Sequence, residues 1–313
     1  MKIKVLKFGG TSVGSVEAIK RSANIICDWS KKSKVIVVLS AMSGETDRLI
    51  NLTKSFSKSP NPVDFDNAIS TGENLSCALM SIYLNNQKTK SKSLHSWQIP
   101  IMTSSEHMKS RILSINKKFL LNELENLDVL VVPGFQGINE RREITTLGRG
   151  GSDTSAVAVA AAMDAECIIY TDVEGVFTTD PNIVPNAKKI NKISYEEMLE
   201  LASQGAKVLQ TRSVELAMRK NTKLSVRSSL KPKKIGTIIT DEKSVLEKNT
   251  VSGIAYTKDE AKITLSRVLD KPGVSSKIFG PLAKGNINVD MILQNISQDG
   301  KFANLSFTLP RAD

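Results

Sequence analysis

The sequence predicts an α/β protein, a three-layer αβα sandwich in which helices cover both faces of a mostly parallel sheet. Short continuous apolar runs lie at 34–40, 128–135 and 166–172, as expected of strands that are buried on both faces. Helical patterns separate these runs over roughly 220 residues, and such alternation is typical of a parallel sheet with helical crossovers. Sheets of this kind bind ligands at the carboxyl ends of their strands.

The remaining elements follow in a regular order. A first strand at 5–8 runs into a glycine-rich turn. Ser194 and Glu197 form a capping box, which predicts that a helix begins there and extends over 195–201. The other helical patterns lie at 16–29, 46–56, 64–84, 117–124 and 154–163.

Composition indicates a globular protein of the cytoplasm. At 313 residues, with 40% apolar and 24% charged residues, the chain can bury a large core and is long enough for roughly two domains. No run approaches the roughly 20 apolar residues of a transmembrane helix, and no signal peptide is recognisable. Cys27, Cys77 and Cys167 are too scattered for a disulfide framework or a zinc site, so we expect reduced thiols.

The net charge of +11 does not by itself indicate a nucleic-acid partner. The lysines are spread along the chain, with modest groups at 31–34, 88–92 and 231–234. Aromatic residues do not interleave with them, as a base-stacking platform would require. We therefore interpret the lysines as a solvated surface, with neither nucleic acid nor membrane as a partner.

The turn after the first strand contains Lys7, Phe8, Gly9 and Gly10. Backbone N–H groups point outward at a strand-to-helix turn, and glycine lets an anion approach closely, so the turn fits a phosphate site. For a lone Gly-Gly pair, however, an ordinary turn is the more frequent explanation.

A second glycine-rich turn, at 148–153, is more informative. Free N–H groups and the positive end of the helix dipole are expected where its helix begins, and Arg149 offers a fork for a carboxylate. A structural loop needs a Gly pair but hardly needs arginine, serine and aspartate in the same turn.

A third stretch, at 170–190, contains Asp172, Asp180 and Pro181, which are also common turn formers. Neither G-x-x-x-x-G-K-[ST] nor G-x-G-x-x-G after a strand is present, so a Walker site is excluded and a dinucleotide-binding fold is disfavoured.

Seven ordered blocks together resemble the aspartate kinases of the amino-acid kinase superfamily. The resemblance covers residues 1 to about 240 and rests on KFGGTSVGS, SAMSGETDRL, STGENLS, FQGIN, TTLGRGGSDTSAVAVA, YTDVEGVFTTDP and GAKVLQTRSVELA. It implies the amino-acid kinase fold and phosphorylation of the side-chain carboxylate of L-aspartate by ATP. The product would be 4-phospho-L-aspartate, in the first step of lysine, threonine and methionine biosynthesis.

The resemblance also implies a phosphoryl-transfer site. Lys7 would neutralise charge on the transferring group, Gly9 and Gly10 would donate N–H groups beside it, and Asp153 would hold Lys7. Mg²⁺ would be held mainly by the nucleotide phosphates, without a protein metal site. The implied ATP contacts are Lys7, Phe8, Gly9, Gly10, Thr171, Asp172, Phe177, Thr178, Thr179, Asp180, Pro181, Asn182 and Lys207.

For the amino acid, the resemblance assigns the ammonium group to Glu73 and the α-carboxylate to Arg149. From the residues alone, Glu73 is also explicable as a charge in the first turn of a helix. Asn74 departs from the Gly-Glu-Arg pattern of the family, which puts a supporting contact in doubt. The other implied contacts are Ser40, Thr46, Gly150, Gly151 and Ser152.

The C-terminal part, from residue 244, resembles part of an ACT regulatory domain, an α+β module. Its pattern predicts strand, strand, helix, strand and strand, and the catalytic domain would span 1–243. The implied contacts to an effector, lysine or threonine, are Asp270, Asn288, Val289, Asp290 and Gln294. ACT modules also join subunits, so we expect a homodimer or a higher oligomer.

The chain stops at Asp313, where the family normally continues. We therefore expect a truncated module that pairs through 251–309 with a second copy or stays poorly ordered, and weak or no inhibition by lysine or threonine.

Two alternatives remain. One is another kinase of the same fold, acting on glutamate or acetylglutamate. The other is a catalytically silent chain that only binds an effector.

Overall fold

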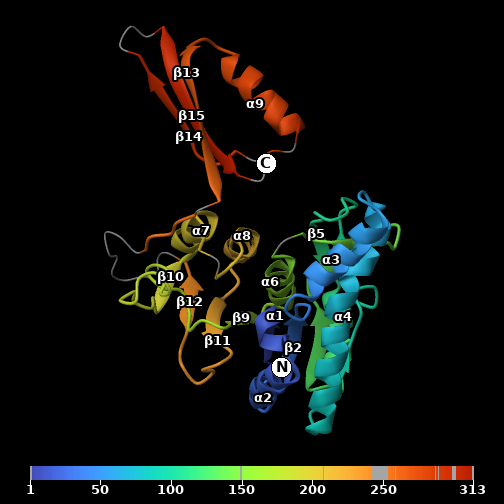
Figure 1. Ribbon diagram of the computed structural model, residues 1–313. Coiled ribbons are helices and arrows are strands. Elements are labelled where there is room, and N and C mark those ends of the chain that lie inside the picture. Colours follow the sequence, from blue (N-terminus) through green and yellow to red (C-terminus); the bar gives the residue numbers. More distant parts are fainter. Residues whose placement is uncertain are drawn as a thin grey trace. The chain divides into compact units, whose positions relative to one another are not determined.

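The computed structural model describes residues 2–99, 101–148, 150–206, 208–241, 253–257, 259–285, 287, 289–297 and 301–311. Contacts divide the chain into two compact units, Met1–Ala255 and Tyr256–Asp313 (Figure 1). The predicted domain boundary between 243 and 244 lies outside the described residues and stays a prediction. Within those residues, no helix is long and apolar enough to cross a membrane.

The first unit is built on a large sheet in which neighbouring strands are parallel except for the pair β11 and β12. The mostly parallel sheet predicted from the apolar runs is therefore confirmed. The order across the sheet is β10 (Lys192–Ser194), β12 (Thr237–Thr240), β11 (Leu224–Ser228), β9 (Glu166–Thr171), β1 (Ile3–Phe8), β2 (Lys34–Leu39), β6 (Val129–Pro133) and β3 (Ser91–Ser93).

Helices cover both faces of this sheet, which confirms the three-layer sandwich. Consecutive residues of β1 pack on opposite faces of the sheet. Leu6 lies in one core cluster with Ile26 and Met80, and Val5 lies in the other with Val157. Helices α2 (Val16–Ser30) and α4 (Pro62–Asn86) contribute to the first cluster. The second cluster contains residues of α5 (Lys117–Glu125), α6 (Gly151–Met163), α7 (Tyr195–Ser203) and α8 (Thr211–Arg219).

Helix termini follow their sequence signals at most positions. The predicted capping box at the start of α7 is confirmed, because the Ser194 hydroxyl accepts from the Glu197 N–H and the Glu197 carboxylate accepts from the Ser194 N–H. In contrast, α6 begins at Gly151 rather than at 154, because Gly150 supplies a left-handed N-cap with φ of 72°. This difference places Asp153 in the first turn of the helix.

A small second sheet leads to the second glycine-rich turn. Its order is β5 (Ile112–Ile115), β4 (Ile101–Thr103), β7 (Gln136–Ile138) and β8 (Ile144–Thr146). The last of these strands ends two residues before Gly148. Two helices, α1 (Gly10–Val13) and α3 (Glu45–Phe56), follow the carboxyl ends of β1 and β2.

The second unit is a three-stranded antiparallel sheet with one helix, within the described residues. The order is β13 (Glu260–Leu269), β15 (Phe302–Pro310) and β14 (Ile292–Ile296), and α9 (Val274–Lys284) packs on the sheet through Phe279 and Phe307. The α+β character expected of an ACT module is confirmed. The strand predicted ahead of β13 is absent from 253–257. Ile254 in this stretch still belongs to the first unit, within which its N–H donates to the Thr178 carbonyl at 2.7 Å.

Candidate active site

The candidate site is built at the carboxyl edge of the large sheet. Strands β1, β2 and β9 are parallel neighbours and end at Phe8, Leu39 and Thr171. The turns after these strands therefore emerge at one edge, where ligands of parallel sheets bind. All three predicted glycine-rich or acidic stretches border this edge.

A nearly buried ion pair joins β1 to the start of α6. Lys7 Nζ lies 2.5 Å from Asp153 Oδ1, and the two side chains are only 12% and 9% exposed. A carboxylate in the first turn of a helix is also stabilised by the helix dipole. The pair keeps a cation fixed at the carboxyl end of β1. The role of Lys7 and Asp153 in phosphoryl transfer, which the resemblance implies, stays a prediction.

The first glycine-rich turn leaves room around this cation. A Cβ at Gly9 would lie 3.3 Å from Lys7 Nζ, and one at Gly10 would lie 3.1 Å from the Ala41 carbonyl oxygen. The Phe8 ring is fully buried and stacks on Tyr170 at a centroid distance of 4.8 Å. The ring is therefore closed to a nucleotide, and a contact of Phe8 with ATP stays a prediction.

Glu73 is a buried carboxylate with one unused oxygen. Its Oε1 accepts from the Ala41 N–H at 3.1 Å, whereas its Oε2 is buried and has no hydrogen-bond partner. Burial raises the pKa of Glu73 to about 7, and the Ala41 N–H lowers it by a smaller amount. Glu73 lies in the middle of α4, so a first-turn charge does not explain it. Such a group suits an incoming cation, because the cation would supply the missing partner.

Close packing of α4 on the turn after β2 places Glu73. A Cβ at Gly72 would lie 2.9 Å from the Ala41 Cβ, so only glycine allows the helix this close to the turn. Ser40 and Thr46, in the same region, are half-buried, and the Ser40 N–H donates to the Phe8 carbonyl at 3.1 Å. Ser40 and Thr46 thus flank the turn that holds Glu73.

The second glycine-rich turn has two positions that only glycine fits without strain. Gly148 and Gly150 have φ of 77° and 72°, and a Cβ at Gly150 would come within 2.1 Å of Gln210. Ser152 is buried in the first turn of α6. Arg149 lies outside the described residues, so its contact with a carboxylate stays a prediction.

Eight of the predicted nucleotide contacts lie at the end of β9 and in the segment that follows it, between 171 and 182. Thr171 ends the strand and donates its hydroxyl to Asp172. The Thr178 N–H donates to the Lys188 carbonyl, and Asp180 accepts from the Asn182 N–H at 2.8 Å. Phe177, Thr179 and Pro181 are half-buried in the same segment. Lys207 lies outside the described residues.

In the second unit, the structure brings together two of the predicted effector contacts. Gln294 Nε2 donates to Asp270 Oδ1 at 3.1 Å. The Asp290 N–H donates to the Thr308 carbonyl, and Val289 is half-buried. Asn288 lies outside the described residues.

Sequence reasoning missed two groups that shape the site. The N–H of Ala41 is a main-chain donor, for which a sequence carries no signal. Arg212 holds the second turn, donating to the Leu147 carbonyl at 2.6 Å and to the Ser110 carbonyl at 3.2 Å. Its basic side chain in the QTRSVELA block was a usable signal in the sequence.

The Asn74 amide oxygen is buried without a hydrogen-bond partner, and nothing in the structure explains it.

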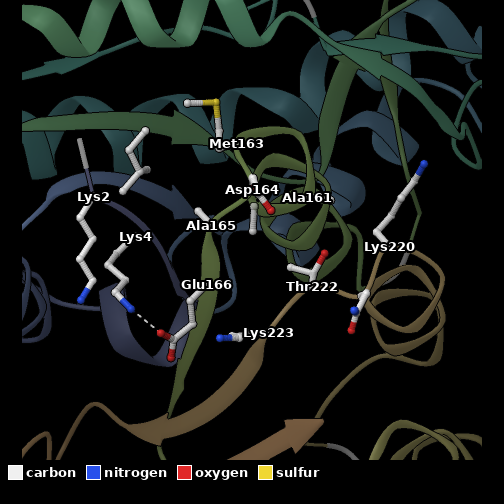
Figure 2. Close-up of a pocket in the computed structure, with 13 residues that line it drawn as sticks. Lys2, Lys4, Ala161, Met163, Asp164, Ala165, Glu166, Lys220, Thr222 and Lys223 are labelled. Carbon is white, nitrogen blue, oxygen red and sulfur yellow. Dashed lines mark hydrogen bonds and ion pairs between the residues drawn. The ribbon is translucent and has the colours of Figure 1, made fainter. Parts of the chain in front are cut away.

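A pocket of about 550 Å³ lies at the opposite, amino-terminal edge of the sheet. Figure 2 shows Lys2, Lys4 and Lys223 near Glu166, with Lys4 ion-paired to Glu166. The pocket also includes the last turn of α6 and the residues after α8. Lysines are favourable beside the carbonyl ends of helices, which accounts for the charge of this pocket. It is separate from the candidate site at the carboxyl edge.

Comparisons with known proteins identify the family. Residues 2–228 match the amino acid kinase family, and residues 263–313 match the ACT domain. An aspartate kinase of Pseudomonas putida is 49% identical over 99% of this chain and 76% of its own length. The structure of E. coli aspartokinase III in complex with aspartate and ADP (R-state) matches 99% of this chain and 79% of its own, with a TM-score of 0.80 and 26% identity.

The same E. coli enzyme in complex with lysine and aspartate (T-state) matches 98% of this chain and 79% of its own, with a TM-score of 0.78 and 26% identity. The chain therefore belongs to the amino acid kinase family. Within that family it belongs to the aspartate kinases, and the resemblance seen in the sequence is confirmed.

Proposed function

We propose that the chain transfers the γ-phosphoryl group of ATP to the side-chain carboxylate of L-aspartate, giving 4-phospho-L-aspartate. The observation that carries the proposal is the nearly buried Lys7–Asp153 pair at the carboxyl edge of the sheet. Its chemistry suits phosphoryl transfer, which depends on positioning and charge neutralisation more than on covalent chemistry. The E. coli neighbour with bound aspartate and ADP supports the choice of substrates.

In the proposed mechanism, Lys7 stabilises the negative charge that develops on the transferring phosphoryl group. Asp153 holds the ammonium group in place, so the charge is already oriented when the reaction begins. Gly9 and Gly10 let the phosphates approach the backbone beside Lys7. Lys207 contributes a second positive charge to the nucleotide phosphates.

The segment after β9 holds the rest of the nucleotide. The assigned residues are Thr171, Asp172, Phe177, Thr178, Thr179, Asp180, Pro181 and Asn182. Within the described parts of the chain, no cluster of three or more His, Cys, Asp or Glu residues could hold a metal. Mg²⁺ would be held mainly by the nucleotide phosphates, where it would neutralise phosphate charge.

Glu73 and Arg149 orient L-aspartate by its two ends. Glu73 Oε2 lacks a partner and would accept from the substrate ammonium, while Arg149 would bind the α-carboxylate. Ser40, Thr46, Gly150, Gly151 and Ser152 complete the substrate site. The reacting side-chain carboxylate is thereby presented to the phosphoryl group beside Lys7.

Regulation and assembly form the second part of the proposal. Asp270, Asn288, Val289, Asp290 and Gln294 would bind lysine or threonine as an effector, and the lysine-bound E. coli neighbour supports this choice. The ACT unit would join subunits into a homodimer or higher oligomer. A reducing location such as the cytoplasm suits the three free cysteines.

Product trapping tests the proposal. The purified chain is incubated with ATP, Mg²⁺ and hydroxylamine, which converts an acyl phosphate into a stable hydroxamate, in the presence of aspartate, glutamate or acetylglutamate. We expect a hydroxamate only with aspartate. Product with glutamate or acetylglutamate instead would assign another kinase of the fold, and no product with any of the three would leave only a regulatory role.

A further inference from the structure

A fully buried carboxylate in the first unit has no part in the proposed reaction. Asp66 lies on α4, two helical turns before Glu73, and is 0% exposed. Its Oδ2 accepts from His107 Nδ1 at 2.9 Å and from the Met108 and Thr146 N–H groups at 3.0 Å each. Its Oδ1 accepts from the Thr146 hydroxyl at 2.6 Å. Four donors around one carboxylate form a fully satisfied buried network, and such networks impose a single local geometry.

The network ends beside the second glycine-rich turn. Thr146 is the last residue of β8, and its carbonyl accepts from both the N–H and the hydroxyl of Ser110 at 2.9 Å. The next carbonyl, of Leu147, accepts from Arg212. The strand that leads into the turn is therefore held from α4 by Asp66 and from α8 by Arg212.

Met108 links the network to the turn by direct contact. Its φ of 66° is unusual for a residue with a side chain, and its N–H is held by Asp66. Its carbonyl oxygen would lie 2.9 Å from a Cβ at Gly148, so the loop packs tightly on the turn. Loss of the bond to Asp66 would release the backbone of Met108 and remove this support.

His107 ties the network to the hairpin between β7 and β8. Its Nδ1 faces Asp66, and its Nε2 lies 3.5 Å from Glu143 Oε2. The Asn139 amide donates to the same Glu143 oxygen at 2.7 Å and holds the pKa of Glu143 below its usual range, with a smaller contribution from His107. The His107 ring therefore connects α4 to the residue that precedes β8.

We propose that Asp66 and His107 are positioning residues for the aspartate site. They fix the end of β8 and the loop 107–110, and thereby the turn that carries Arg149, Gly150 and the start of α6. This inference rests on the proposed function, because it assigns the turn to the amino-acid substrate. Neither residue touches a substrate in this role. Loosening the turn should weaken aspartate binding, while the ATP segment after β9 keeps its own contacts.

The test compares steady-state constants of variants at His107. His107→Ala should raise the KM for aspartate by about 5- to 100-fold, since small misplacements of a substrate-positioning group have effects of this order, with the KM for ATP within about twofold. His107→Asn keeps an N–H donor at the position of Nδ1 and should restore most of the affinity. His95→Ala is the matched control, because His95 is the other histidine of the chain and is exposed.

The outcomes separate this inference from the proposed function. An active parent whose His107→Ala variant keeps both KM values, or raises both equally, would overturn the positioning role alone. A parent that makes no aspartyl phosphate would overturn the proposed function and this inference with it. If His107→Ala fails to fold, Thr146→Val provides the test, because it removes only the hydroxyl donor to Asp66 Oδ1. This variant should show the same selective rise in the aspartate KM. Equal KM values for Thr146→Val and the parent would refute the positioning role.

Discussion

At the scale of single residues, Glu73 is the group whose behaviour should be most visible in solution. Burial raises its pKa to about 7, yet the proposed contact with an ammonium group requires the ionised form. Binding of aspartate below pH 7 must therefore release a proton. The free protein has the opposite preference: protonated Glu73 contributes stability that is fully present below its ordinary pKa of 4.5 and is lost as the pH rises through about 7.

The kinetic consequence is a pH-dependent aspartate site. Between pH 8 and pH 6, kcat/KM for aspartate should fall about tenfold, because the ionised fraction of a group with a pKa of about 7 falls by that factor. Glu73→Gln should have a lower kcat/KM and should lack this inflection. The assignment fails if the parent shows no change over this range, or if the variant keeps the inflection.

The cysteines provide a second prediction at this scale. Cys77 and Cys167 are buried, and burial raises the pKa of both thiols, so neither should react as a thiolate in the folded protein. Cys27 is half-buried. A thiol reagent should label one cysteine rapidly in the native protein and three in denaturant, and Cys27→Ser should abolish the rapid phase. Rapid native labelling in Cys27→Ser would contradict the packing around β9 or α4.

At the scale of elements, the capping box of Ser194 and Glu197 determines where α7 begins. Ser194→Ala removes the acceptor for the Glu197 N–H and should lower the free energy of unfolding by about 1 kcal/mol, measured by urea denaturation. The kinetic constants should stay unchanged, because the cap lies outside the proposed site. Ser203→Ala, at the exposed last residue of the same helix, is the control and should change stability by less than about 0.5 kcal/mol. Equal effects of the two substitutions would contradict the cap.

Sequence patterns predicted some helices and strands of the fold and missed others. Continuous apolar runs identified β2, β6 and β9, because strands buried on both faces cannot alternate with polar residues. The small sheet was not predicted, because β4, β7 and β8 have three residues each, too few to show a period. The start of α6 was placed three residues late, because its glycines resemble a loop and not a helix.

The candidate site could be predicted only in part. Lys7 and Asp153 are far apart in the sequence, so their pairing came from the resemblance to a family and not from any local pattern. The contact of Glu73 with the Ala41 N–H depends on main-chain geometry and on the close approach at Gly72. Tertiary contacts of this kind leave no signal in a single sequence.

At the scale of the whole molecule, the two units have separate proposed tasks. Asp270→Ala and Gln294→Ala should each weaken the binding of lysine or threonine, measured by calorimetry, by about fivefold or more, because each removes one member of a hydrogen-bonded pair. Thr264→Ala is the control, since it removes an exposed hydroxyl contact with Ser306 in the same unit. A parent chain that binds neither amino acid would contradict the effector site.

At the carboxyl edge of the sheet, Lys7 and Glu73 have different proposed roles. Lys7 stabilises the transferring phosphoryl group, and Glu73 binds the amino acid. The most direct test measures kcat and both KM values for Lys7→Ala and Glu73→Gln side by side. Lys7→Ala should lower kcat by about 10²- to 10³-fold, the usual effect of removing a group that stabilises transition-state charge, with the aspartate KM within about twofold. Glu73→Gln should raise the aspartate KM by tens to about a thousandfold and leave the ATP KM nearly unchanged. An unchanged kcat in Lys7→Ala, or a Glu73→Gln variant that binds aspartate normally and loses ATP, would contradict the account.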